Sequence, residues 1–170
     1  NPYLADFYEN MSKWGFHSQL FFLTKRLELY RKMAQTPGVV VQDRGIFEDA
    51  EIFARNLYIR GNMSERDHDL YTDLYDQCTK LMLVPGFVVY LKSSVPVLAE
   101  RIAKRGNDYE KDVPVKYLEQ LNNLYDAWIN RFSQSPVVTI EYDGLDVVDR
   151  PKDFEYVKGL IDAQLEKHMC

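Results

Sequence analysis

A carboxylate next to a guanidinium at the end of an apolar run is the first feature of this sequence that could do chemistry. Asp43 and Arg44 directly follow Val39–Val41, a β-branched run that predicts a strand covered on both faces. In open α/β sheets, ligands bind outside the carboxyl ends of the strands. We therefore favour a functional site for Asp43 and Arg44 over a surface ion pair, which would contribute little to stability.

A second set of polar residues falls on helical faces that are otherwise apolar. Gln19 and Arg26 are seven residues apart, so they share one face of a helix, and Asp49 and Phe53, four apart, share another. An amide, a guanidinium and an acid offer directional hydrogen bonds, and a ring can stack, which together would suit a nucleobase. The alternative is that Gln19 and Arg26 lie on a solvated face and that Phe53 is ordinary core.

A third, basic segment ends a predicted helix. Arg101 and Arg105 are one turn apart, with Lys104 beside them and Gly106 following. Cations near a helix C-terminus are favoured by the helix dipole alone. The functional alternative is an arginine clamp on phosphate oxygens.

Two motifs are absent from the sequence. It contains no G-x-x-x-x-G-K-[ST] phosphate-binding loop and no G-x-G-x-x-G.

The three histidines of the sequence are scattered without metal-ligand spacing, so we expect no zinc site and assign no metal ligand among the side chains.

The elements that must position these residues alternate between helix and strand. Pro/Gly pairs, caps and apolar periodicity predict strands at 39–43, 87–91 and 137–140, and helices at 12–34, 46–58, from 65 (buried stripe Leu70, Leu74, Cys78, Leu81), 95–105, from 114, and 152–167. This order predicts an α/β fold, an open parallel sheet with helices on both faces.

The composition indicates one ordinary globular domain. The chain has 170 residues, 46% hydrophobic, and a formal net charge of −5. An acidic balance argues against a nucleic acid polymer or an anionic membrane as partner, and no apolar stretch approaches the ~20 residues of a membrane span. Its two cysteines, which we interpret as reduced thiols, predict a cytoplasmic protein.

Four segments, read in order, resemble the deoxynucleoside kinases, and in particular the bacterial deoxyadenosine/deoxyguanosine kinases. They are Asn1-Pro-Tyr-Leu with Phe7-Tyr8, Trp14 and Gln19; Asp43-Arg-Gly-Ile-Phe-Glu-Asp49; Tyr90-Leu-Lys-Ser-Ser94; and Glu100-Arg-Ile with Lys104-Arg-Gly106 and Glu110. The resemblance implies a P-loop-kinase-like fold and transfer of a phosphoryl group from ATP, with Mg²⁺, to the 5′-hydroxyl of a deoxynucleoside. It also implies a homodimer, for which the helices at 12–34 and 46–60 are candidates.

The resemblance also implies roles for residues. Gln19 would hydrogen-bond the base, Phe53 would stack on it, and Arg26 with Asp49 would favour bases other than thymine. Tyr8 and Glu110 would hold the 3′-hydroxyl of the sugar. Asp43 and Arg44 would lie at the reacting 5′-hydroxyl. Arg101 and Arg105 would belong to a lid that closes on the phosphates.

The chain departs from the family pattern in three places. The family usually has Glu-Arg-Ser where this chain has Asp43-Arg44-Gly45, so both the glutamate and the serine are replaced. Asn107 stands where many members have a lid arginine. The family's first strand, phosphate loop and catalytic base would precede Asn1. We therefore expect residues 1–170 to be a single, N-terminally truncated kinase domain that is inactive alone.

Two other functions remain open at this point. A non-catalytic binding or scaffold subunit would explain the absent phosphate loop, whereas the set of base-reading residues argues against it. A thymidylate-type nucleoside monophosphate kinase also uses an Asp-Arg strand end, but Tyr8 and Gln19 favour the deoxynucleoside kinases.

Overall fold

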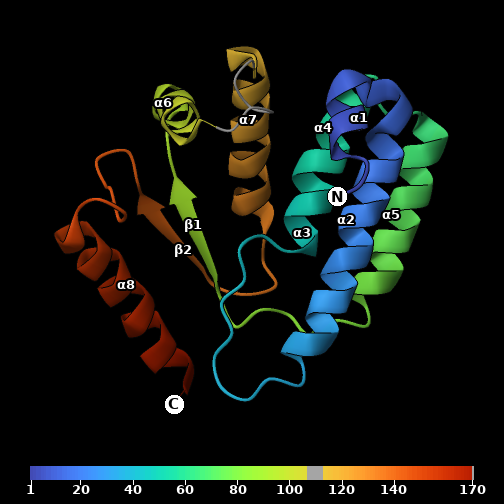
Figure 1. The fold of residues 1–170 in the computed structure, drawn as a ribbon. Coiled ribbons are helices and arrows are strands. Elements are labelled where there is room, and N and C mark those ends of the chain that lie inside the picture. The colour runs from blue at the N-terminus through green and yellow to red at the C-terminus, as the bar shows by residue number, and fades with distance from the viewer. Residues whose placement is uncertain (107–112, 170) are drawn as a thin grey trace. The chain divides into compact units, whose positions relative to one another are not determined.

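The computed structural model describes residues 1–106 and 113–169 and is organised as two compact units (Figure 1). Unit 1 comprises Asn1–Leu83 and Asn123–Trp128, and unit 2 comprises Val84–Asn122 and Ile129–Cys170. Helix α7 (Val115–Arg131) contributes residues to both.

Unit 1 is helical. Its elements are α1 (Leu4–Glu9), α2 (Met11–Met33), α3 (Ile46–Glu48), the π-helical segment η1 (Asp49–Ala54), α4 (Arg55–Ile59) and α5 (Glu65–Thr79). The long helices α2 and α5 pack against one another, as Figure 1 shows, and both contact η1. The segment predicted as one helix, 46–58, is helical throughout. Its central turns are π-helical, however, and π-helical turns are often found at functional sites.

Local side-chain bonds start the two long helices. The Asn10 side chain accepts a hydrogen bond from the Lys13 backbone N–H at 3.0 Å. The Ser64 hydroxyl accepts a hydrogen bond from the Asp67 backbone N–H at 3.1 Å, as predicted for the start of the helix from 65. Gly15 allows α2 to approach the turn after α4, because a Cβ there would lie 2.9 Å from the Asn62 carbonyl oxygen.

The core of unit 1 lies between α2, η1 and α5. It contains Phe7, Leu23, Ile46, Ala54, Leu57, Met63, Tyr71 and Cys78. The predicted α5 stripe is wrong except for Cys78: Leu70, Leu74 and Leu81 are exposed. Tyr71 is buried instead, and Tyr75 packs against the same core, so the buried face is shifted by one residue towards the aromatic side chains.

Unit 2 contains the sheet. Strands β1 (Val88–Lys92) and β2 (Val137–Glu141) pair in parallel, with Val88 opposite Val137 and Lys92 opposite Glu141. Helix α6 (Val95–Arg105) follows β1, and α8 (Pro151–Met169) follows β2. Gly106 ends α6 in a left-handed conformation (φ 66°), as its position in the sequence predicts. The α/β prediction with parallel strands is confirmed, although the described sheet has two strands.

The third predicted strand does not form. Residues 39–42 have no strand assignment, and Val41 is 85% exposed. A β-branched run favours an extended backbone, but a strand also needs a neighbour to take its backbone hydrogen bonds. Within 1–106 and 113–169 only β1 and β2 pair.

None of the described helices is both long and apolar enough to span a bilayer.

Candidate active site

An ion pair between a half-buried guanidinium and a buried carboxylate joins α2 to η1 at the centre of the candidate site. Arg26 Nε donates to Asp49 Oδ2 at 2.9 Å, and the two side chains are 19% and 6% exposed. Arg26 Nη1 also donates to the Asp43 carbonyl at 3.2 Å. One guanidinium therefore connects the two acidic positions that the sequence singled out.

The electrostatics of Asp49 are a balance of opposing effects. Burial raises the pKa of its carboxyl above the usual value, although the hydrogen bond and charge of Arg26, and the charge of Arg44, oppose the rise. Removing two charges from water costs free energy that their attraction offsets only with good geometry. A buried charged pair of this kind is therefore a candidate functional site.

Gln19 lies on α2, seven residues before Arg26, and is 5% exposed. The alternative of a solvated face is therefore wrong for both residues. Gln19 Oε1 is buried without a hydrogen-bond partner among the described residues. An unsatisfied buried acceptor is costly, so this amide is a candidate for binding a polar group.

Arg44 and Phe53 form a cation–π contact. The Arg44 guanidinium carbon lies 5.2 Å from the centre of the Phe53 ring. Arg44 has a φ of 57° and occupies the turn just before α3. The structure thus pairs Arg26 with Asp49 and Arg44 with Phe53. Tyr8 is 38% exposed, and its ring meets the Phe7 ring edge-on. Glu110 lies outside the described residues.

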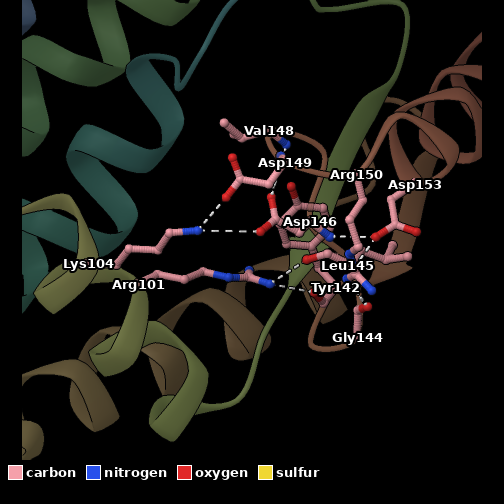
Figure 2. A network of polar contacts seen from close by, with 10 residues as sticks. All are labelled: Arg101, Lys104, Tyr142, Gly144, Leu145, Asp146, Val148, Asp149, Arg150 and Asp153. Carbon is pink, nitrogen blue, oxygen red and sulfur yellow. Dashed lines mark hydrogen bonds and ion pairs between the residues drawn. The ribbon is translucent and has the colours of Figure 1, made fainter.

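In unit 2, Arg101 is bound by the chain itself. Its Nη1 donates to Ser93 Oγ at 3.1 Å. Its Nη2 donates to the carbonyls of Tyr142 and Leu145 at 2.8 and 2.9 Å (Figure 2). Its guanidinium also lies 4.5 Å from the centre of the Tyr142 ring. This arginine therefore ties α6 to the loop that follows β2.

Lys104 adds a second tie to the same loop. Its Nζ lies 2.6 Å from Asp149 and 3.6 Å from Asp146 (Figure 2). Asp146 in turn accepts from the amides of Val148 and Asp149 at 3.1 and 3.0 Å. The last turn of α6 thus holds a loop at the carboxyl ends of both strands, while Arg105, the second predicted lid arginine, is exposed.

The described side chains include no group of three or more His, Cys, Asp or Glu residues able to hold a metal ion. Kinase Mg²⁺ is usually held by one or two carboxylates together with substrate phosphates, so it does not require such a group.

The whole chain fits one family. The family model described as "Deoxynucleoside kinase" matches residues 1–166. The chain belongs to the deoxynucleoside kinase family. It is 31% identical to a deoxyadenosine/deoxycytidine kinase of Bacillus subtilis, over 92% of this chain and 73% of that protein. It is 32% identical to a deoxyguanosine kinase of the same organism, over 95% of this chain and 81% of that protein.

Solved structures agree with this assignment. A deoxyadenosine kinase from M. mycoides with products dCMP and dCDP matches with a TM-score of 0.82 and 26% identity, covering 96% of this chain and 81% of that chain. The fold, the family and the predicted kinase class therefore agree.

Sequence reasoning missed two residues near the candidate site of this deoxynucleoside kinase. Glu48 Oε2 accepts from the Gly45 amide at 2.7 Å, and its position three residues after Gly45 is a recognisable capping signal. Burial raises the pKa of Tyr125, a residue of α7, to about 12. The positive charge of Arg44 opposes this rise, and the negative charges of Glu48 and Asp49 add to it. No local pattern in the sequence connects Tyr125 with these charges.

The bonds of Arg101 make a prediction about stability. We expect Arg101→Met to lower the free energy of unfolding by about 2 kcal/mol, because two carbonyls and a hydroxyl lose a charged donor. Chemical denaturation measures this. The control is Lys158→Met, which removes an exposed pair with Asp162 and should leave the unfolding free energy unchanged. Equal effects of the two substitutions would contradict the anchoring role of Arg101.

Proposed function

We propose that this chain provides the deoxynucleoside site of a kinase that transfers a phosphoryl group from ATP to the 5′-hydroxyl of a deoxynucleoside, with a purine preferred. The observation that carries the proposal is the Arg26–Asp49 pair, at 2.9 Å. Its arginine lies on the same helix as the buried Gln19, whose amide oxygen has no hydrogen-bond partner among the described residues. The names of the two Bacillus relatives, for deoxyadenosine/deoxycytidine and deoxyguanosine, support the same substrate class.

The base is read by hydrogen bonds of fixed direction. Adenine presents an amino donor beside a ring-nitrogen acceptor, and the Gln19 amide offers the complementary acceptor and donor. Binding would thereby satisfy Gln19 Oε1, which lacks a partner among the described residues. Arg26 and Asp49 add a further donor and acceptor, and Phe53 offers a ring for stacking.

The reacting end of the substrate lies with Arg44 and Asp43. Phosphoryl transfer is mainly positioning and charge neutralisation, and Arg44 would supply both at the 5′-hydroxyl. Tyr8 and Glu110 would hold the 3′-hydroxyl, which fixes the sugar. Mg²⁺, when bound with ATP, would neutralise phosphate charge. Asp43 would act beside Arg44 at the 5′-hydroxyl.

The lid assignment is divided between the two arginines. Arg101 already donates to Ser93 and to two carbonyls, so we propose that it supports the lid and meets phosphate only through its remaining donors. Arg105, one turn later, is the stronger candidate for direct contact with phosphate oxygens.

We also propose a homodimer and a cytoplasmic location. The helices at 12–34 and 46–60, the candidates for the interface, carry the exposed apolar side chains Leu29 and Ile59. A dimer interface would bury such residues, and Leu70 and Leu74 on α5 are also exposed. Light scattering of the purified protein measures its mass. The free, buried Cys78 is consistent with a reducing compartment.

The substrate preference is testable with the full-length gene product. We expect kcat/KM for deoxyadenosine or deoxyguanosine to exceed that for thymidine by at least about tenfold, because mismatched buried donors and acceptors are penalised. An ATP-coupled assay with the four deoxynucleosides measures this.

Three other results would count against the proposal. A thymidine preference would overturn the roles of Arg26 and Asp49. Phosphorylation of thymidylate alone would favour a nucleoside monophosphate kinase. Absence of turnover with every substrate, in a protein that folds, would favour the non-catalytic subunit.

A further inference from the structure

Arg44 has an unusual backbone. Its φ of 57° is the only positive φ of a non-glycine residue within 1–106 and 113–169. A side chain other than glycine rarely adopts this left-handed conformation, because its Cβ crowds the backbone. Such a conformation persists only where neighbouring contacts impose it, and it is often found at functional sites.

Glu48 supplies such a contact. The peptide N–H of Gly45, the residue after Arg44, donates to Glu48 Oε2 at 2.7 Å. Glu48 is the third residue of α3, which starts at Ile46, so its carboxylate reaches back across the first turn in the manner of a capping box. Gly45 has no side chain with which to form the other half of that box, so Glu48 provides the side-chain closure of this turn.

Gly45 makes room for the carboxylate. A Cβ at position 45 would lie 3.3 Å from Glu48 Oε2, closer than is usual for such a contact. The family usually has serine at this position, where the side chain itself could cap the helix. Gly45 and Glu48 thus form half of a capping box: the glycine lacks a side chain that could accept from the Glu48 N–H, and the Glu48 carboxylate accepts from the Gly45 N–H.

The Glu48 carboxylate is held by the protein more than by water. Burial raises its pKa, the Gly45 N–H and the charge of Arg26 oppose this rise, and the charge of Asp49 adds to it. On the other side of the turn, the Arg44 guanidinium lies 5.2 Å from the Phe53 ring centre.

We propose that Glu48 is a positioning residue for Arg44: by accepting the Gly45 N–H, it fixes the left-handed turn and directs the Arg44 guanidinium towards the reacting 5′-hydroxyl. Glu48 itself touches neither substrate nor phosphate in this proposal. The inference rests on the proposed kinase function, in which Arg44 acts at the 5′-hydroxyl.

The test compares Glu48→Ala with Glu48→Gln in the full-length gene product. We expect Glu48→Ala to lower kcat about tenfold, since small displacements of a positioned group are costly in rate. The KM for the deoxynucleoside should stay within about twofold, because base recognition is untouched. Glu48→Gln retains a carbonyl acceptor for the Gly45 N–H and should restore kcat to within about twofold of the wild type.

The matched control is Ser64→Ala. It removes the cap at the start of α5, where Ser64 Oγ accepts from the Asp67 amide at 3.1 Å. This variant should lower the melting temperature about as much as Glu48→Ala does, without changing kcat. A similar loss of kcat in both variants would show a general effect of stability and would overturn the proposal.

Other outcomes are equally decisive. A wild-type kcat in Glu48→Ala, or a Glu48→Gln as slow as the alanine variant, would also overturn the positioning role. If Glu48→Ala does not fold, Gly45→Ala displaces the same carboxylate by a few tenths of an ångström and should lower kcat in the same direction, whereas an unchanged kcat would contradict the proposal. A wild-type protein that phosphorylates no deoxynucleoside would instead contradict the proposed function.

Discussion

Replacing Arg44 by alanine is expected to lower kcat by about 100- to 1000-fold while leaving the fold intact. In the proposed reaction, this guanidinium neutralises charge that develops between the 5′-hydroxyl and the transferred phosphoryl group. The fold should be little affected, because residue 44 is exposed and alanine meets the same backbone strain as arginine at a φ of 57°.

Arg44→Lys separates charge from geometry. Lysine keeps the positive charge but loses the planar fork of donors and the stacking geometry over Phe53, so we expect a kcat between those of the wild type and the alanine variant. Steady-state rates with saturating ATP and deoxynucleoside measure the effect, and circular dichroism checks the fold.

Arg55→Ala is the matched control for Arg44→Ala. Arg55 is also an arginine of unit 1, with a side chain 48% exposed and a long contact of 3.9 Å to Glu51. Its loss should leave kcat unchanged. Near-normal turnover in Arg44→Ala, or an equal loss in the Arg55 control, would remove Arg44 from the mechanism.

The helices of this chain could be predicted from sequence because their signals are local. Ser64 caps α5, and Gly106 ends α6 in a left-handed conformation, at the positions where the sequence indicates a start and a stop. The buried face of α2 was also predictable in part, because Gln19 and Arg26 are spaced by two turns among apolar residues.

Features that depend on distant partners could not be predicted in the same way. The run Val39–Val41 has strand-like composition, but strand formation requires a neighbour that a local pattern does not specify. On α5, Leu70 and Tyr71 are both apolar candidates for the core, and only packing against α2 and η1 decides that Tyr71 is buried.

The candidate site shows the same division. Residue types at Arg26, Asp49 and Phe53 indicated base recognition, and the structure adds the ion pair between Arg26 and Asp49. The bonds of Arg101 to the carbonyls of Tyr142 and Leu145 span more than forty positions of the sequence. Carbonyl acceptors leave no trace in residue identity, so the sequence indicated only the helix dipole or phosphate binding for this arginine.

The Arg26–Asp49 pair makes the second large prediction. Asp49→Ala should lower the free energy of unfolding by about 2 to 3 kcal/mol, because it leaves the half-buried Arg26 guanidinium without its carboxylate. The same variant should raise the KM for a purine deoxynucleoside more than it lowers kcat, since in the proposed function the pair contacts the base and not the reacting hydroxyl. Denaturant titration and steady-state kinetics measure the two effects.

The double variant Arg26→Met/Asp49→Leu distinguishes an unpaired charge from lost packing. If the cost of Asp49→Ala comes from the stranded guanidinium, replacing both partners with apolar side chains should recover most of the lost stability, because a buried pair replaced by well-packed apolar residues is often close to neutral. Base recognition should not recover, since the hydrogen-bonding groups are gone.

The control is an ion pair of similar length on the same helix but at the surface. Lys25 and Glu28 lie 2.8 Å apart, with side chains 52% and 53% exposed, so Glu28→Ala should leave both stability and KM unchanged within error. If Asp49→Ala behaves like this control, the buried pair neither supports the fold nor reads the base. If stability falls while KM for the purine stays constant, the pair is structural, and base selection must reside in Gln19 and Phe53.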